Sequence, residues 1–222
     1  MYLSIIAVGK IGNSIEKKPA KKSPVPPFTT STLQQEASRK LGYSVSQTMI
    51  VAQKLYEAGL ITYMRTDSIN LSQDATNAAV KEITTLYGAD YAQERVYSKK
   101  IKGAQEAHEA IRPSYMHKKT IEGESSHQKL YNLIWKRTIS SQMSDATFDR
   151  TNIKISLSNS NEKFIAKGEV ITFEGFMKVY LEGKDDDNQT IDGVLPNIKN
   201  GEILKLVEAV ASEQFTRPPA RY

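Results

Sequence analysis

The sequence predicts an α+β protein in which a mainly helical domain is inserted into a β region. Residues 31–86 repeat apolar side chains at helical spacing, between residues that typically begin or end helices. Residues 148–158 instead alternate apolar and polar side chains, the period of a half-buried strand, and the chain also begins with β-branched residues. Because β-type sequence occurs at both ends, the simplest topology places the helical block between two parts of one β scaffold.

The first 28 residues are predicted to form a strand and a linker. Residues 3–9 are apolar and β-branched, which favours a strand. Residues 10–28 are rich in Lys, Pro and Ser and end in PVPPF, which favours an extended linker because each proline disfavours helix at the residue before it. A short run of lysines in this linker is more typical of a solvated segment than of a binding site: Lys17, Lys18, Lys21 and Lys22.

Two helices are predicted next, and each begins at a capping box. Ser31 with Gln34 marks the first start and Ser44 with Gln47 marks the second, while Gly42 and Gly59 end the two helices. The second helix should turn one stripe of side chains toward the core: Val45, Met49, Ala52, Leu55 and Tyr56. Residues 60–64 then favour a short strand. Helix, turn, helix and strand in this order resemble a winged helix, but a generic helical hairpin fits the pattern equally well.

The remaining elements complete the predicted domains. A third helix should begin at Ser72 and end at Gly88, with a buried face of Ala75, Ala79, Ile83 and Leu86. After an irregular stretch at 89–120, a helix at 126–143 should bury Leu130, Ile134 and Trp135. Residues 148–158, 163–181 and 202–210 have β character, with an acidic turn at 183–188. The expected domains are therefore residues 1–28 (strand and basic linker), 29–147 (helical) and 148–222 (β region).

Composition excludes several classes of protein. The 222 residues carry a formal net charge of +5 and contain no cysteine, which excludes disulfides and cysteine-based zinc sites within the chain and fits a cytoplasmic location. No apolar run approaches the ~18 residues that a membrane span needs. A basic chain favours an anionic partner such as nucleic acid, although this signal is weak by itself.

The first candidate site is the segment GLITYMRTDS at residues 59–68. On an extended backbone Tyr63, Arg65 and Asp67 point to the same side, which places a phenol, a guanidinium and a carboxylate in a row. A phenol has a pKa of about 10 and becomes a useful nucleophile when cations stabilise its anion. Arginine can do this and can also bind a phosphate through two hydrogen bonds. On the pattern alone, a surface strand with an Arg–Asp pair is the more frequent interpretation.

The second candidate site is the segment AQEAHEAIRP at residues 104–113. His108 and Arg112 lie four apart and share a face if the segment is helical, where both could donate hydrogen bonds to a phosphate. The segment lacks the second histidine of the H-E-x-x-H zinc motif, so a zinc site is rejected. An exposed helix with Glu–His–Arg charge pairs remains the alternative.

Four segments together resemble bacterial type IA DNA topoisomerases, in the same order and with matching spacing. They are PFTTSTLQ at 27–34, LYEAGLITYMRTDS at 55–68, QEAHEAIRP at 105–113 and FTRPPARY at 215–222. The resemblance covers nearly the whole chain from residue 27 onward, and the tyrosine segment is long and specific. It implies a toroidal enzyme in which a helical domain hangs from a β arch. It also implies transient cleavage and resealing of single-stranded DNA, which relaxes negative supercoils without ATP.

The resemblance also assigns roles to individual residues. Tyr63 corresponds to the nucleophile, Arg65 to the arginine that stabilises the phosphate and phenolate, and His108 to the histidine that contacts the scissile phosphate. Supporting roles fall to Asp67, Glu57 and Arg112.

The resemblance also implies domains that do not occur in this sequence. The Toprim domain, whose acidic cluster binds Mg²⁺, and the second helical domain do not occur here, so we expect no metal ligands in the chain and no activity from the chain alone. Two alternatives are a non-enzymatic winged-helix DNA-binding module and a tyrosine-dependent nuclease that acts alone.

Overall fold

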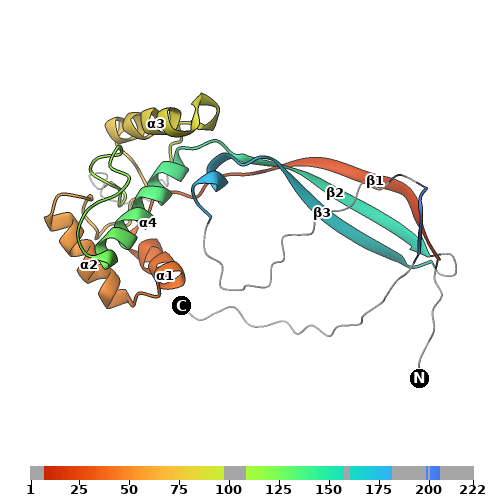
Figure 1. Cartoon of the computed structure of the whole chain (residues 1–222), viewed down its shortest axis with the longest axis horizontal. Helices are drawn as coiled ribbons and strands as arrows, with labels where there is room; N and C mark the ends of the chain where they lie inside the picture. The colour runs from red at the N-terminus through yellow and green to blue at the C-terminus, as the bar shows by residue number, and fades with distance from the viewer. Residues whose placement is uncertain (1–7, 98–108, 158–160, 182–198, 200, 206–222) are drawn as a thin grey trace, which may run out of the picture. The chain divides into compact units, whose positions relative to one another are not determined.

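The protein contains both helices and a β-sheet, which confirms the predicted α+β class. The structure is a computed structural model that describes residues 8–97, 109–157, 161–181, 199 and 201–205 (Figure 1). It divides into two compact bodies. The helical body comprises Pro19–Asp149 and Ile171–Thr190, and the strand body comprises Met1–Lys18, Arg150–Val170 and Ile191–Tyr222. In the sequence, the helical body therefore lies between parts of the strand body.

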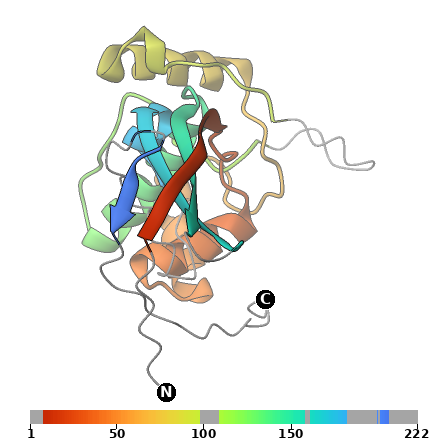
Figure 2. The same ribbon diagram turned by 90° about the vertical axis from the view of Figure 1, so that its right-hand side faces the viewer.

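Four strands form one sheet in the order β3-β2-β1-β4. Their bounds are Val8–Lys22 for β1, Ala146–Leu157 for β2, Lys163–Phe173 for β3 and Ile203–Lys205 for β4. β1 and β4 are antiparallel, with Gly9 opposite Leu204, and Figure 2 shows the two strands side by side. The side-chain pairs Thr147–Thr172 and Arg150–Glu169 run in opposite directions along β2 and β3, so this pair is also antiparallel.

The predicted linker at residues 10–28 is wrong over most of its length, because β1 continues to Lys22. The lysines of the run are exposed, as the linker interpretation also expected, but the backbone is in the sheet beside β2. Pairing with a strand more than a hundred residues away decides the conformation here, and composition does not report such pairing. Among the described residues, β4 pairs with β1 only at Val8–Lys10, so this neighbour does not need an N–H from Pro19.

Four α-helices make up most of the helical body: α1 (Thr30–Leu41), α2 (Val45–Glu57), α3 (Gln73–Tyr87) and α4 (Ser125–Ser141). Two short 3₁₀ helices, η1 (Ala89–Tyr91) and η2 (Gly175–Lys178), follow α3 and β3. Among the described residues, no helix is long and apolar enough to cross a membrane.

The helix caps correct one prediction and confirm others. The first capping box is formed by Thr29 with Thr32 rather than by Ser31 with Gln34, so α1 begins earlier than predicted. Ser44 and Ser72 cap α2 and α3 as predicted, each accepting a hydrogen bond from a backbone N–H three residues later. The return bond from the Gln47 side chain, which would complete the predicted capping box, is not formed within the described part of the chain. Gly42 ends α1 in the left-handed conformation, with φ of 69°, which glycine adopts without steric cost.

The predicted buried stripes are partly wrong at their ends. α2 buries Thr48, Val51, Ala52 and Leu55, whereas Val45 and Tyr56 are exposed. Leu86 at the end of α3 is also exposed, while Ala75, Ala79 and Ile83 are buried as predicted. The 3.6-residue period was correct, but in α2 the buried face is rotated slightly, and a polar threonine completes it.

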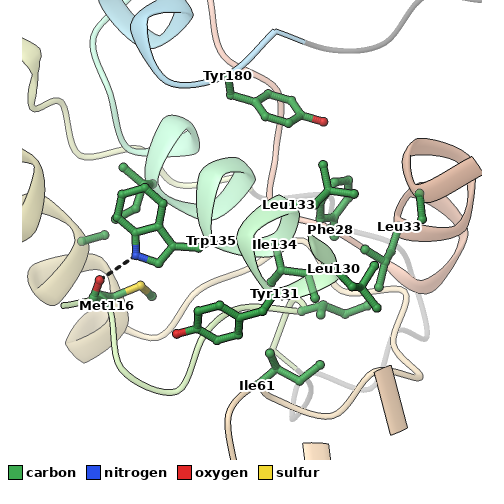
Figure 3. Packing of buried hydrophobic residues seen from close by; sticks show 14 of the residues in the cluster. Phe28, Leu33, Ile61, Met116, Leu130, Tyr131, Leu133, Ile134, Trp135 and Tyr180 are labelled. Carbon is green, nitrogen blue, oxygen red and sulfur yellow. Dashed lines mark hydrogen bonds between the residues drawn. The ribbon is translucent and has the colours of Figure 1, made fainter. Parts of the chain in front are cut away.

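α4 lies at the centre of the helical body and contacts α1, α2 and α3. Its residues Leu130, Ile134 and Trp135 are fully buried, as predicted. The indole N–H of Trp135 donates to the carbonyl of Met116 at 2.8 Å (Figure 3), so the largest core side chain has no unsatisfied polar group. α4 therefore supplies the centre of the core of this body.

A buried polar cluster fixes the chain where it enters α1. Arg137 of α4 donates to the carbonyl of Pro26 at 2.6 Å, and its guanidinium stacks over the ring of Phe28 with 4.8 Å to the centroid. Tyr180 donates to the Glu36 carboxylate at 2.8 Å. Burial raises the pKa of Tyr180, and the bond to Glu36 raises it further, so Tyr180 remains a donor at neutral pH. This cluster holds the segment that leads into the candidate site.

Candidate active site

Three segments that are distant in sequence lie side by side in the helical body. Phe28 pairs with Ile111 and Ile61 pairs with Pro113, each as an isolated antiparallel bridge. The N–H of Thr30 donates to the carbonyl of Thr66 at 2.9 Å, which joins the first of these segments to the one that contains Tyr63. The structure therefore brings together residues 28–30, 60–66 and 110–114, which belong to three of the four segments that carried the family resemblance. The fourth, at 215–222, lies outside the described residues.

The Tyr63 segment begins at a tight reversal after α2. Gly59 has φ of 68°, and its N–H donates to the carbonyl of Tyr56 at 2.8 Å, while the N–H of Leu60 donates to the carbonyl of Leu55 at 2.9 Å. These two bonds are the Schellman pattern that satisfies the last carbonyls of a helix. The reversal directs the following residues back along the end of α2, and a residue with a β-carbon at position 59 would be strained.

Two threonine hydroxyls hold the backbone on either side of Tyr63. The hydroxyl of Thr62 donates to the carbonyl of Ala110 at 2.7 Å and accepts from the N–H of Arg112 at 2.9 Å. The hydroxyl of Thr30 accepts from the N–H of Thr66 at 2.9 Å and lies 2.8 Å from the carbonyl of Met64. The two hydroxyls therefore tie the segment to residues 110–112 on one side and to the start of α1 on the other.

The predicted strand at residues 60–64 is wrong, because only Ile61 forms a bridge and bends follow. Burial nevertheless alternates from residue 63 to residue 67, as it does on an extended backbone. Tyr63, Arg65 and Asp67 are exposed, and the intervening Met64 and Thr66 are buried. Two buried side chains thus separate the three exposed side chains that the sequence analysis named as candidates.

Arg65 differs from other arginines of the helical body in its contacts. Within the described part of the chain, neither Arg65 nor Asp67 makes a hydrogen bond or ion pair, so the predicted Arg–Asp pair is not formed there. Arg95, in contrast, pairs with Asp145. An exposed guanidinium without an anionic partner keeps its five donors available for an anion such as phosphate.

Arg112 already has a partner. Its guanidinium donates to both oxygens of Glu109, at 2.7 and 3.3 Å, and to the carbonyl of Pro113 at 2.9 Å. Glu109 also accepts from the N–H of Ser72 at 2.6 Å. Burial acts to raise the pKa of Glu109, but the hydrogen bonds from Arg112 and Ser72 outweigh it and hold the pKa below its usual value. The Glu–Arg pair of the alternative interpretation is therefore formed, but residues 109–114 do not form the exposed helix on which that interpretation placed it.

Residues 109–114 are not helical, so the geometry that would place His108 and Arg112 on one helical face does not apply to them. His108 itself lies outside the described residues. Glu57, the remaining supporting candidate, is exposed in the last turn of α2 and accepts from Gln53 at 2.7 Å. The structure adds nothing to its predicted role.

Sequence reasoning missed three residues of this site. Tyr56, predicted to lie in the core, is exposed and its ring lies 5.3 Å from that of Tyr63, at an interplanar angle of 65°. Thr30 and Thr62 were not singled out, although they anchor the segment. A threonine in an apparent strand gives no local sign that its hydroxyl bonds a distant backbone.

Exposure distinguishes Tyr63 from most other tyrosines. Of the tyrosines that the structure describes, Tyr56, Tyr63 and Tyr115 expose 40%, 43% and 53% of their surface and the others are more covered. Tyr97 and Tyr131 donate to the carbonyls of Ser141 and Lys118, and burial raises the pKa of each to about 12. Those phenols are poor candidates for chemistry at neutral pH.

The described residues around Tyr63 were compared with the ligand sets that hold metal ions. Within the described ranges, no group of three or more His, Cys, Asp or Glu side chains could hold a metal ion. The nearby carboxylate of Glu109 is already bound by Arg112 and Ser72. The described residues therefore do not fit the Mg²⁺ ion that the resemblance implies for the complete enzyme.

Comparison with known proteins agrees with the motif analysis. The sequence is 52% identical over 220 residues to DNA topoisomerase 1 of Streptomyces coelicolor, covering 94% of this chain and 23% of that protein. It is 48% identical over 226 residues to a prokaryotic-type DNA topoisomerase 1 of Acanthamoeba polyphaga mimivirus, covering 95% of this chain and 26% of that protein. The chain thus spans about a quarter of the length of these relatives.

A solved structure and a family comparison extend this result. Full-length topoisomerase I from Thermotoga maritima superposes with a TM-score of 0.74 at 34% identity, over 91% of this chain and 33% of that one. The DNA topoisomerase family matches residues 9–222. The chain therefore belongs to the DNA topoisomerase family.

Proposed function

We propose that this chain is the part of a type IA DNA topoisomerase that supplies the nucleophile, and that the nucleophile is Tyr63. The phenol oxygen attacks a phosphodiester of single-stranded DNA, and the bond from phosphorus to the 3′ oxygen breaks. The phenol loses its proton and the departing 3′ oxygen gains one, which leaves a 5′-phosphotyrosyl link and a free 3′-hydroxyl. Reversal of the step after strand passage reseals the DNA, so ATP is not required.

The observation that carries this proposal is an exposed phenol on an immobilised backbone. Tyr63 is 43% exposed, whereas Met64 beside it is buried and the flanking residues are held by the hydroxyls of Thr30 and Thr62. Nucleophilic catalysis needs a reactive atom that DNA can reach and a support that fixes its position. Both requirements are met at Tyr63.

Arg65 is the group that we assign to charge stabilisation. It follows Tyr63 by two residues, is exposed, and makes no ion pair among the described residues, so it can bind the scissile phosphate through two hydrogen bonds. Charge stabilisation of this kind commonly contributes strongly to catalysis. Arg112 is committed to Glu109, and in this proposal it orders the neighbouring backbone. Contact between His108 and the phosphate remains a prediction from the family resemblance.

Other parts of the complete protein are needed for activity. Mg²⁺ would assist the phosphate chemistry from ligands outside the described residues, and the remainder of the protein would complete the DNA-binding groove. The family relatives are about four times as long as this chain, which leaves room for both. We therefore assign nucleophilic attack, and not the complete relaxation reaction, to this chain.

The experiment compares two tyrosine variants in the full-length protein that contains this chain. A 3′-labelled single-stranded oligonucleotide, whose label stays on the fragment that the 5′-phosphotyrosyl link attaches, is incubated with the wild type, Tyr63→Phe and Tyr115→Phe, and the reaction is stopped with denaturant. Tyr115→Phe makes the same change at another exposed tyrosine. We expect the wild type and Tyr115→Phe to retain a covalent 5′-phosphotyrosyl adduct and Tyr63→Phe to form none.

The result also separates the competing functions. Adduct formation by Tyr63→Phe would place the nucleophile elsewhere. Binding of the oligonucleotide by the wild type without any adduct would favour a non-enzymatic DNA-binding module. If the isolated chain is tested in the same assay, repeated cleavage of the oligonucleotide would favour a nuclease that acts alone.

A further inference from the structure

The side chain of Tyr56 lies against the proposed nucleophile although it has no place in the core. Its ring centroid is 5.3 Å from that of Tyr63, with the planes inclined at 65°, an edge-to-face arrangement. α2 meets the core through other residues, and 40% of Tyr56 is exposed. Edge-to-face contact is a favourable geometry for two aromatic rings.

The reversal at Gly59 makes this contact a fixed feature of the fold. Tyr56 is in the last turn of α2, and its own carbonyl accepts the Gly59 N–H that forms the reversal. The segment then returns past the helix end and is held by Thr62. Both backbones that carry the two rings are therefore restrained independently of the rings.

Backbone restraint alone does not orient a phenol. Tyr63 has two rotatable side-chain bonds, and at 43% exposure its ring has few neighbours that could limit them. Among the described residues, Tyr56 is the aromatic ring within contact distance of Tyr63. A ring on one side restricts the conformations of the phenol and leaves the other side open to DNA.

We propose that Tyr56 is a positioning residue, whose ring holds the phenol of Tyr63 in the orientation from which it attacks the phosphate. This inference rests on the proposed function of Tyr63. Tyr56 acts through shape and ring contact, so its hydroxyl is not needed for the effect. Loss of one such contact should slow cleavage about three- to tenfold, the range expected from the strength of aromatic pairs.

The test uses the full-length protein with three variants: Tyr56→Phe, Tyr56→Leu and, as matched control, Tyr115→Leu. Cleavage of a labelled single-stranded oligonucleotide is measured in a single turnover at saturating protein, and the Kd is measured separately. We expect Tyr56→Leu to cleave three- to tenfold more slowly with its Kd unchanged. Tyr56→Phe and Tyr115→Leu should cleave at the wild-type rate. Thermal unfolding of each variant is measured to check that folding is retained.

Three results would overturn the inference: cleavage by Tyr56→Leu at the wild-type rate, an equal loss in Tyr56→Phe, or weaker DNA binding with normal cleavage at saturation. The second would assign the effect to the hydroxyl and the third to a DNA contact. These outcomes are separate from the proposed function, which fails if Tyr63→Phe still forms the adduct or if the wild type forms none.

Discussion

Replacement of Thr30 by valine tests whether the start of α1 fixes the Tyr63 segment. Valine has nearly the shape of threonine but neither accepts the hydrogen bond from Thr66 N–H nor donates to the Met64 carbonyl. The backbone bond from Thr30 N–H to Thr66 is retained. Each lost bond to a covered partner is worth about 1 kcal/mol. The free energy needed to open the segment locally should therefore fall by about 2 kcal/mol.

Hydrogen exchange reports this local opening directly. In the full-length protein, a loss of about 2 kcal/mol predicts roughly 30-fold faster amide exchange in peptides that cover residues 61–70. Thr138→Val is the matched control, because that buried hydroxyl donates only within α4, to the carbonyl of Ile134 at 2.9 Å. Thr30→Ser keeps the hydroxyl and should restore most of the protection.

The reasoning would be refuted by either of two results. Unchanged exchange at residues 61–70 in Thr30→Val would mean that the hydroxyl does not restrain the segment. An equal increase in Thr138→Val would mean that the effect is a general loss of stability rather than a local one.

Three further predictions concern charge and completeness. Arg65→Lys in the full-length protein should slow single-turnover cleavage at least about tenfold, because lysine keeps the charge but loses the planar fork; an unchanged rate would contradict the assigned role. The lowered pKa of Glu109 means that its pairing with Arg112 stabilises the fold fully above the unfolded pKa of about 4.3, and that this stabilisation is lost as the pH falls through the lower folded value. Thermal unfolding from neutral to acidic pH should therefore depend less on pH in Glu109→Gln than in the wild type. The 222-residue chain alone, given supercoiled plasmid and Mg²⁺, should leave the plasmid supercoiled, and relaxation that disappears in Tyr63→Phe would disprove this.

Local sequence predicted the helices well because their signals are local. Ser44 and Ser72 bond backbone groups three residues away, and Gly42 provides a conformation that other residues avoid. Local sequence predicts less well which side of a helix is buried. In α2, the apolar residues Val45 and Tyr56 lie next to the buried side, and only tertiary contacts decide which side chains are covered. β1 shows the same limit, because its conformation depends on pairing with a distant strand.

The candidate site shows a similar division. Sequence predicted that Tyr63, Arg65 and Asp67 share an exposed side, and burial alternates accordingly, although bends and not a regular strand carry these residues. The partners that hold this backbone could not be predicted, because Thr30 and Ala110 are more than thirty residues away from the atoms that they bond. The ring contact of Tyr56 depends on the reversal at Gly59 and required the structure.

The distance of these partners along the chain has a consequence for the order of folding. Residues 60–66 form neither a helix nor a ladder of their own, and their long-range hydrogen bonds reach residues 30 and 110–114. Contacts of such long sequence separation form late, because closing the intervening loops costs entropy before any bond is gained. During synthesis the segment cannot be completed until the chain has emerged beyond residue 114. The backbone that carries the proposed nucleophile, Tyr63, is therefore fixed only after residues 110–114 have joined it.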